Sequence, residues 1–180
     1  MSLTLATLIP GLLLLALGVP LLLNHSGFAA VLKAFPRSQA AAYLFFGAGA
    51  AWFLWGAIWK LSPADFGEYR LYLFFGFLVV AILSFKCVPD FLAVRGLATL
   101  ILMGAMPLLD AGFMHYEHWQ INFYKVLVYV AISLAIWLGA QPWRFRDFVQ
   151  WLLAQPERAR GVGGAIAGYG LLLAIVAFTY

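Results

Sequence analysis

The chain alternates long apolar runs with short polar or proline-containing breaks. Each run approaches the ~20 residues that a helix needs to cross a bilayer. Six runs give approximate spans at residues 3–23, 40–59, 69–87, 91–110, 120–140 and 162–180. The runs lack strand-like alternation, and backbone groups in lipid need partners within the spanning element. We therefore predict an all-α integral membrane protein, a single transmembrane domain over residues 1–180 whose roughly six helices form three hairpins.

The third run is the shortest, because only residues 71–85 are continuously apolar before Lys86. A span is still expected there if the Lys86 side chain snorkels to the interface and the helix extends back through Glu68 to Arg70. Without that extension the chain would have five spanning helices instead of six.

The N-terminal run has no Lys or Arg ahead of it. A secretory signal peptide needs a positive segment before its apolar core and a small-residue cleavage site after it. Residues 3–23 are therefore interpreted as a retained first helix.

Two shorter segments, 28–35 and 145–153, are amphipathic and are expected to lie in the membrane interface, the second beside Arg144 and Arg146, which would favour anionic headgroups. Phe28 lies eight residues before Pro36, and Phe148 lies eight residues before Pro156. Phe91 occupies a comparable place without a following proline. The offsets of close to 60 residues suggest one hairpin per repeat. Chance similarity is the alternative explanation.

Composition and charge agree with insertion in lipid. The chain of 180 residues is 65% hydrophobic and 10% charged, whereas about a quarter of the residues in a soluble domain are charged. Cations occur singly or in pairs, which argues against a nucleic-acid-binding patch. The odd-numbered connections hold eight of the 11 cations: Lys33, Arg37, Lys86, Arg95, Arg144, Arg146, Arg158 and Arg160. This asymmetry predicts that both termini lie on the outer side of a bacterial cytoplasmic membrane.

The fourth connection contains the densest group of polar side chains. The candidate metal ligands in it are His115, His118, Asp110 and Glu117. Imidazole nitrogens and carboxylate oxygens together suit zinc, iron or copper. The alternative is a solvated loop in which Tyr116 and Trp119 belong to the aromatic belt at the interface.

Asp110 and Lys125 form the second candidate. Asp110 follows the apolar part of the fourth span and Lys125 lies near the start of the fifth. A charge at membrane depth is costly and tends to be paired or functional. The two residues are expected either to fasten their hairpin as an ion pair or to act as a proton relay.

Small residues are concentrated in the second and sixth spans. Gly47 and Ala51 mark the second, and Gly164 and Gly168 mark the sixth. Such spacing lets helix backbones approach closely in lipid. The contact is expected inside the chain or, alternatively, between subunits.

A stripe of Trp52, Trp55 and Trp59 lies along the second span. It could receive a flat apolar cofactor, but it is more typical of a helix face that meets lipid or packs within the bundle.

No motif of a hydrolase, di-iron oxidase or ATPase occurs, and no catalytic residue or named cofactor is predicted. The preferred hypothesis is a non-catalytic accessory or scaffold subunit of a membrane complex, with lipid and other membrane subunits, or further copies, as partners. One alternative is a small-solute or ion transporter built from repeated hairpins. Another is a metal- or cofactor-binding redox subunit.

Overall fold

The computed structural model describes residues 1–115 and 117–180. It is 83% helical, and the described residues contain no strand. Six of its helices are long and apolar enough to cross a membrane: Leu3–Leu22, Gln39–Ile58, Gly67–Cys87, Leu92–Ala111, Ile121–Ala140 and Pro156–Val176. The predicted all-helical class and the six long apolar helices are confirmed.

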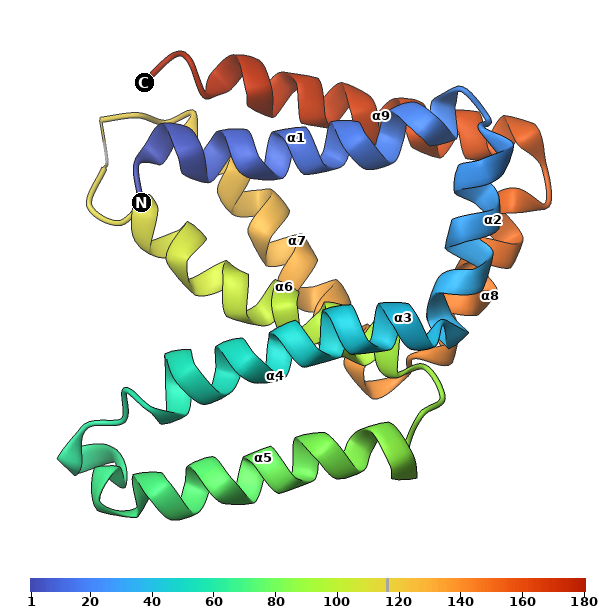
Figure 1. The fold of residues 1–180 in the computed structure, drawn as a ribbon. Coiled ribbons are helices and arrows are strands. Elements are labelled where there is room, and N and C mark those ends of the chain that lie inside the picture. The colour runs from blue at the N-terminus through green and yellow to red at the C-terminus, as the bar shows by residue number, and fades with distance from the viewer. Residues whose placement is uncertain (116) are drawn as a thin grey trace. The chain divides into compact units, whose positions relative to one another are not determined.

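Figure 1 shows the order of the elements. The first half of the chain contains α1 (Leu3–Leu22), α2 (Ser26–Ala34), η1 (Phe35–Arg37), α3 (Gln39–Ala41), η2 (Ala42–Phe46), α4 (Gly47–Phe53), η3 (Leu54–Ile58), η4 (Pro63–Asp65) and η5 (Gly67–Tyr69). The second contains α5 (Arg70–Cys87), α6 (Leu92–Ala111), α7 (Ile121–Ala140), α8 (Trp143–Leu153) and α9 (Pro156–Val176).

Helix boundaries follow local chemistry as well as hydropathy. The apolar run 71–85 lies inside a longer helix, Gly67–Cys87, that extends past it at both ends. The last helix begins at Pro156, earlier than the predicted residue 162, because proline suits the first turn of a helix while Arg158 and Arg160 interrupt the apolar pattern.

The helix Gln39–Ile58 is not uniformly α-helical. Its turns η2 and η3 are π-helical and lie on either side of α4. A π-helical turn inserts a wider hydrogen-bonded ring and changes which side chains share a face. Faces assigned from a period of 3.6 residues are therefore shifted along this helix.

The chain divides into two compact units. Unit 1 contains Met1–Lys33, Gly104–Ser133 and Arg146–Tyr180, and unit 2 contains Ala34–Met103 and Leu134–Phe145. The helices α6 and α7 each contribute residues to both units.

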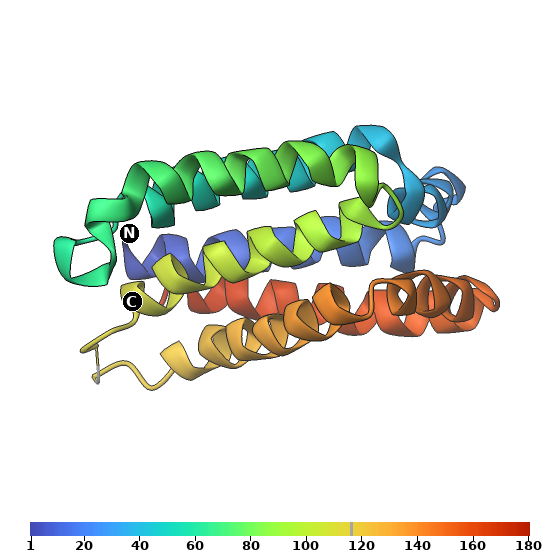
Figure 2. The same ribbon diagram turned by 90° about the horizontal axis from the view of Figure 1, so that it is seen from below.

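In unit 1, α1 and α9 lie side by side and antiparallel along their length (Figure 1). A Cβ added to Gly18 would lie 2.5 Å from the Ala167 backbone nitrogen, and one added to Gly170 would lie 2.7 Å from the Gly11 carbonyl oxygen. The helices therefore meet backbone to backbone, which is possible only where side chains are absent or minimal. Both ends of the chain lie at the same end of this pair (Figure 2).

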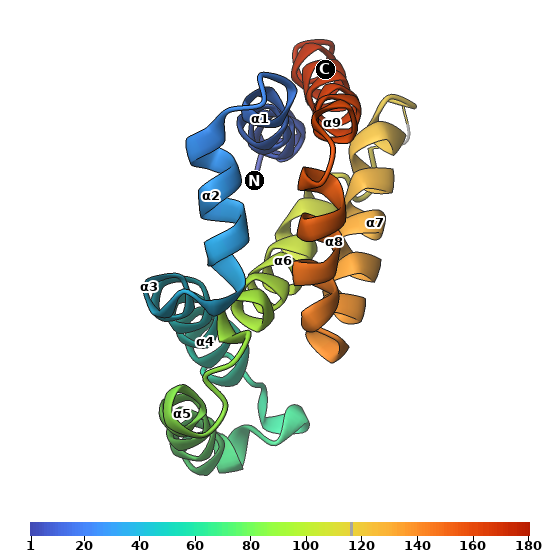
Figure 3. The same ribbon diagram turned by 90° about the vertical axis from the view of Figure 1, so that its right-hand side faces the viewer.

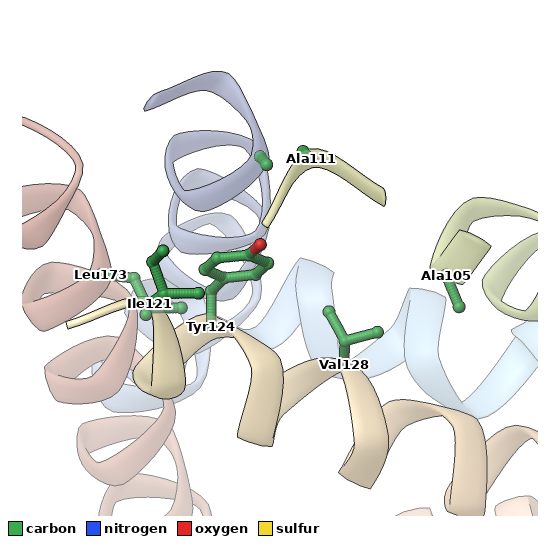
Figure 4. Packing of buried hydrophobic residues seen from close by; sticks show 7 residues of the cluster. Ala105, Ala111, Ile121, Tyr124, Val128 and Leu173 are labelled. Atoms are coloured by element: carbon green, nitrogen blue, oxygen red, sulfur yellow. The ribbon is translucent and has the colours of Figure 1, made fainter. Parts of the chain in front are cut away.

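A cluster of buried apolar residues lies beside the helix pair (Figure 4). Its members are Ala6, Ala105, Ala111, Ile121, Tyr124, Val128 and Leu173. They come from α1, the C-terminal part of α6, the N-terminal part of α7, and α9. Four helices from distant parts of the chain thus share one core.

In unit 2, aromatic rings join the helix Gln39–Ile58, and Trp59 directly after it, to α5. Ring centroids are 4.9 Å apart for Tyr43 and Phe85, 5.2 Å for Phe53 and Phe77, and 5.7 Å for Trp59 and Phe74. The order of these contacts makes the two helices antiparallel. A closer contact lies on α6, where a Cβ on Gly96 would collide with the Phe46 backbone.

Short helices precede two of the long helices. The amphipathic segments 28–35 and 145–153 are largely helical, within α2–η1 and within α8. Pro36 lies in η1 ahead of the helix Gln39–Ile58, and Pro156 opens α9. Figure 3 shows α2 following α1 after a change of direction, and α8 leading into α9. The two segments compared in the sequence repeat therefore share a local order: short helix, proline, long helix.

Candidate functional site

The predicted metal ligands occupy the end of α6 and the connection that follows it. Asp110 is exposed in the last turn of α6. His115 Nδ1 lies 3.7 Å from Glu117 Oε1, and both side chains are largely exposed. The His118 ring is instead partly covered by Tyr180, with centroids 5.6 Å apart. The structure thus pairs His115 with Glu117 and places His118 against the C-terminal residue.

No group of three or more His, Cys, Asp or Glu side chains that could hold a metal ion is found among residues 1–115 and 117–180. Tyr116, assigned to the aromatic belt in the sequence analysis, lies outside the described residues. Trp119 is exposed and packs its ring against Phe123. The metal site remains a prediction without geometric support.

Lys125 contacts the end of α6 through a backbone carbonyl, whereas the sequence predicted a contact with the Asp110 side chain. Its Nζ donates a hydrogen bond of 3.1 Å to the Gly112 carbonyl oxygen. An ion pair with Asp110 is not among the contacts of the described residues. The last carbonyls of a helix lack partners within it, so a lysine here stabilises the end of α6 and closes the α6–α7 connection.

The most buried polar groups were not singled out in the sequence. Thr7 on α1 has no exposed surface. Its hydroxyl donates to the Leu3 carbonyl oxygen over 3.1 Å and is hydrogen-bonded to the Tyr180 hydroxyl over 3.2 Å. Tyr169 on α9 donates to the Phe123 carbonyl oxygen over 2.8 Å. These contacts join α1, α7, α9 and the C-terminal segment within unit 1.

Tyr124 is fully buried, and its hydroxyl oxygen has no hydrogen-bond partner among the described residues. Figure 4 shows the ring within the apolar cluster, with its oxygen on the side of Ala111. A Cβ on Gly112 would collide with this oxygen. The hydroxyl is therefore packed directly against the backbone at the end of α6, which leaves no space for a ligand between them.

We call Thr7, Lys125, Tyr169 and Tyr180 the polar brace. Its members supply hydroxyls and one amine, and several of their bonds end on backbone carbonyls or on each other. A catalytic nucleophile would instead need a basic side chain within hydrogen-bonding distance of it. The arrangement is suited to holding helix ends together.

Lys125 was singled out in the sequence but the other members of the brace were not, because their contacts are long-range. Thr7 and Tyr180 are 173 residues apart, and neither is in a recognisable motif. A threonine inside an apolar run was the available signal, but it did not indicate a partner.

The tryptophan stripe lies in unit 2 and surrounds η3. The Trp55 and Trp59 rings are parallel within 2°, with centroids 5.8 Å apart, and the Arg70 guanidinium lies 5.0 Å above Trp59. Trp52 lies against Gly56 instead. Trp55 keeps 64% of its surface exposed, so one ring of the stacked pair is largely accessible.

The predicted packing residues are not the ones used in the closest contacts. No described atom lies within 4 Å of a Cβ added to Gly47 or to Gly168, and Gly164 meets only a side-chain atom of Leu22 at 3.5 Å. Ala51 is exposed. Close packing of α9 uses Gly163, Ala167 and Gly170 instead, so the four predicted positions are largely free.

A shallow apolar groove of about 410 Å³ lies at the α1–α2 corner. It is lined by Val19, Pro20, Leu23, His25, Gly27, Phe28 and Val31. The His25 Nδ1 atom already accepts a hydrogen bond of 3.3 Å from the Phe28 backbone nitrogen. The groove therefore offers an apolar surface and no charged group.

Comparison of the chain with family models, with curated proteins and with solved structures finds no match.

Proposed function

We propose that the chain is a non-catalytic accessory or scaffold subunit of a membrane protein complex and that α5 contacts its partner. The observation that carries this proposal is the exposure of α5. None of its 18 residues, all of them described, is buried. Its contacts with the helix Gln39–Ile58 are made by rings, which leaves the opposite face available.

That opposite face has the form of a helix-packing surface. Tyr72, Gly76, Val79 and Leu83 follow helical spacing, whereas Phe74, Phe77 and Phe85 lie on the side of the ring contacts. No described atom lies within 4 Å of a Cβ added to Gly76. A glycine bordered by larger apolar residues lets a second helix approach closely in lipid.

Polar groups inside the long helices support a structural role. The Thr99 hydroxyl donates to the Arg95 carbonyl oxygen over 3.0 Å, and the Ser133 hydroxyl donates to the Tyr129 carbonyl oxygen over 2.9 Å. Both hydroxyls thus bond within their own helix. Neither provides evidence of a polar path for a solute.

The proposal includes a location in a bacterial cytoplasmic membrane with both termini on the outer side. The eight-to-three division of cations between alternate connections favours this orientation. The antiparallel α1–α9 pair, with the two chain ends at one end of it, is compatible with both termini on one side.

Purification in mild detergent, with mass spectrometry of the co-eluting chains, tests the proposal. A defined partner, or a second copy, is expected to remain with the wild-type chain. Gly76→Leu adds volume to the open face of α5 and is expected to reduce this association at an unchanged melting temperature.

Gly161→Leu is the matched control, because Gly161 also has no described atom within 4 Å of an added Cβ but lies at the start of α9. Its association is expected to equal that of the wild type. A chain that elutes with lipid alone, or equal losses in the two variants, would contradict the proposal.

A transporter is the second candidate, favoured by the two π-helical turns in the helix Gln39–Ile58. Such turns occur frequently at functional sites, and Trp55 and Trp59 stack across η3. The corresponding test is proton-linked uptake into liposomes by the purified chain and its loss in Asp110→Asn.

A further inference from the structure

The α8–α9 elbow, defined as residues 146–160, has one buried and one exposed apolar side. Val149 and Leu152 are 3% and 2% exposed, whereas Phe148 and Trp151 each keep 49% of their surface accessible. Three arginines accompany these rings. Exposed aromatic residues beside cations are typical of a helix that lies at the surface of a membrane.

Arg158 is held in place by Trp151. Its guanidinium carbon lies 5.1 Å from the centre of the indole ring, and its Nη1 makes a long hydrogen bond of 3.5 Å to the Trp151 carbonyl oxygen. Trp151 in turn stacks on Phe148, with centroids 5.9 Å apart. A guanidinium lying over a ring retains donors at its edge, and its fixed orientation lowers the entropic cost of binding an anion.

The other charges decide which arginines are available. Arg146 donates to the Asp147 carboxylate over 2.8 Å and is therefore already neutralised. Arg160 is exposed in the first part of α9, and Glu157 is an exposed carboxylate in the first turn. Arg144 is also exposed, and its Nε donates to the Gln141 side-chain oxygen over 3.2 Å. Arg158 is the cation that Trp151 holds in a fixed orientation beside the exposed rings.

We propose that the α8–α9 elbow binds the headgroup phosphate of an anionic phospholipid through Arg158. Trp151 and Phe148 contact the glycerol and upper acyl region of the same lipid. Arginine matches the geometry of a phosphate with two parallel hydrogen bonds. A phospholipid is the anion that also presents apolar chains to the exposed rings. The proposal is independent of the partner assigned to α5.

Native mass spectrometry of the full chain tests this lipid site. The protein is reconstituted in equimolar phosphatidylglycerol and phosphatidylcholine and released with its retained lipids. Phosphatidylglycerol is expected to be retained preferentially. Arg158→Gln is expected to reduce that preference about fivefold, and Trp151→Leu is expected to reduce it less.

Arg160→Gln is the matched control, because it removes the same charge two residues further along α9, where residues two apart lie on different faces of the helix. It is expected to retain most of the preference. Melting temperatures measured by circular dichroism identify a variant that fails to fold; Arg158→Lys, which retains the charge, then replaces Arg158→Gln and is expected to lower the preference partly. Equal loss in Arg160→Gln, an unchanged preference in Arg158→Gln, or release of the lipid by excess inorganic phosphate would overturn the proposal.

Discussion

The pair α1–α9 and the pair formed by α5 with the helix Gln39–Ile58 are both antiparallel, but they meet in different ways. In the first pair, glycines at positions 11, 18, 163 and 170 bring backbone atoms together. In the second, rings such as Phe53 and Phe77 are interposed between the helices. Lipid chains are as apolar as these side chains, so association depends on close packing and hydrogen bonds and not on exclusion of water. The backbone-packed pair should therefore be the more specific and the less tolerant of substitution.

The two kinds of contact leave different amounts of helix surface exposed in the two pairs. Buried residues occur at regular intervals along α1 and α9, including Ala6, Gly18 and Leu173. None occurs along α5. A helix held by rings at one side remains open to a further helix, which is why α5 is the site of the proposed partner contact.

The largest effect is expected from Gly18→Leu. A Cβ there would lie 2.5 Å from the Ala167 nitrogen and 2.8 Å from the Gly163 carbonyl oxygen, and backbone cannot move aside as a flexible side chain can. We expect a loss of about 3 kcal/mol in the free energy of unfolding, measured by denaturant titration in detergent. Gly168→Leu, on the same α9 helix pair but at an open position, should change stability by less than about 0.5 kcal/mol. Equal effects of the two substitutions would remove the distinction between packed and open glycines.

Gly96→Leu tests whether unit 2 has a backbone contact of its own. The added side chain would collide with the Phe46 backbone at η2. We expect a loss of about 2 kcal/mol, seen as a lowered melting temperature by circular dichroism. Gly47→Leu, one residue after Phe46 but with open space around its Cβ, is the control. An unchanged melting temperature in Gly96→Leu would indicate that unit 2 is packed mainly through its ring contacts.

Phe77→Leu tests the ring-packed pair. The substitution retains an apolar side chain but removes the edge-to-face contact with Phe53, whose ring centroid is 5.2 Å away at an interplanar angle of 82°. A loss of about 1 kcal/mol is expected, and Phe53→Leu/Phe77→Leu should cost little more than either single change. A loss as large as that of Gly18→Leu would show that the two pairs tolerate substitution equally.

Thr7→Val should have the smallest effect. It removes the hydrogen bond to the Tyr180 hydroxyl while keeping the shape of the side chain. Interhelical hydrogen bonds in membranes contribute about 0.6 kcal/mol on average, and a loss of that order is expected in the free energy of unfolding. Tyr180→Phe removes the same bond, so the double variant should be no less stable than either single one. Additive losses would indicate that the two hydroxyls are not bonded to each other.

The fold class could be predicted from the sequence with little ambiguity, whereas the candidate site could not. Runs of apolar residues determine helices locally, and even the short run 71–85 lies within one long helix. The GxxxG spacing predicts Gly164 and Gly168 as packing positions, but the glycines of α9 in closest contact are Gly163 and Gly170. Neighbouring glycines on one helix face different directions, and composition does not say which direction meets another helix.

The sequence by itself determined six long apolar helices, their approximate places and the short helices at 28–35 and 145–153, because each depends on residues close together in the chain. Tertiary structure alone decided that the first helix pairs with the last and that Thr7 bonds to Tyr180. It also decided that Lys125 caps Gly112 and that Arg158 lies over Trp151. The long-range contacts depend on how helices approach one another. Hydropathy cannot predict that approach, because lipid and neighbouring helices present similar apolar surfaces.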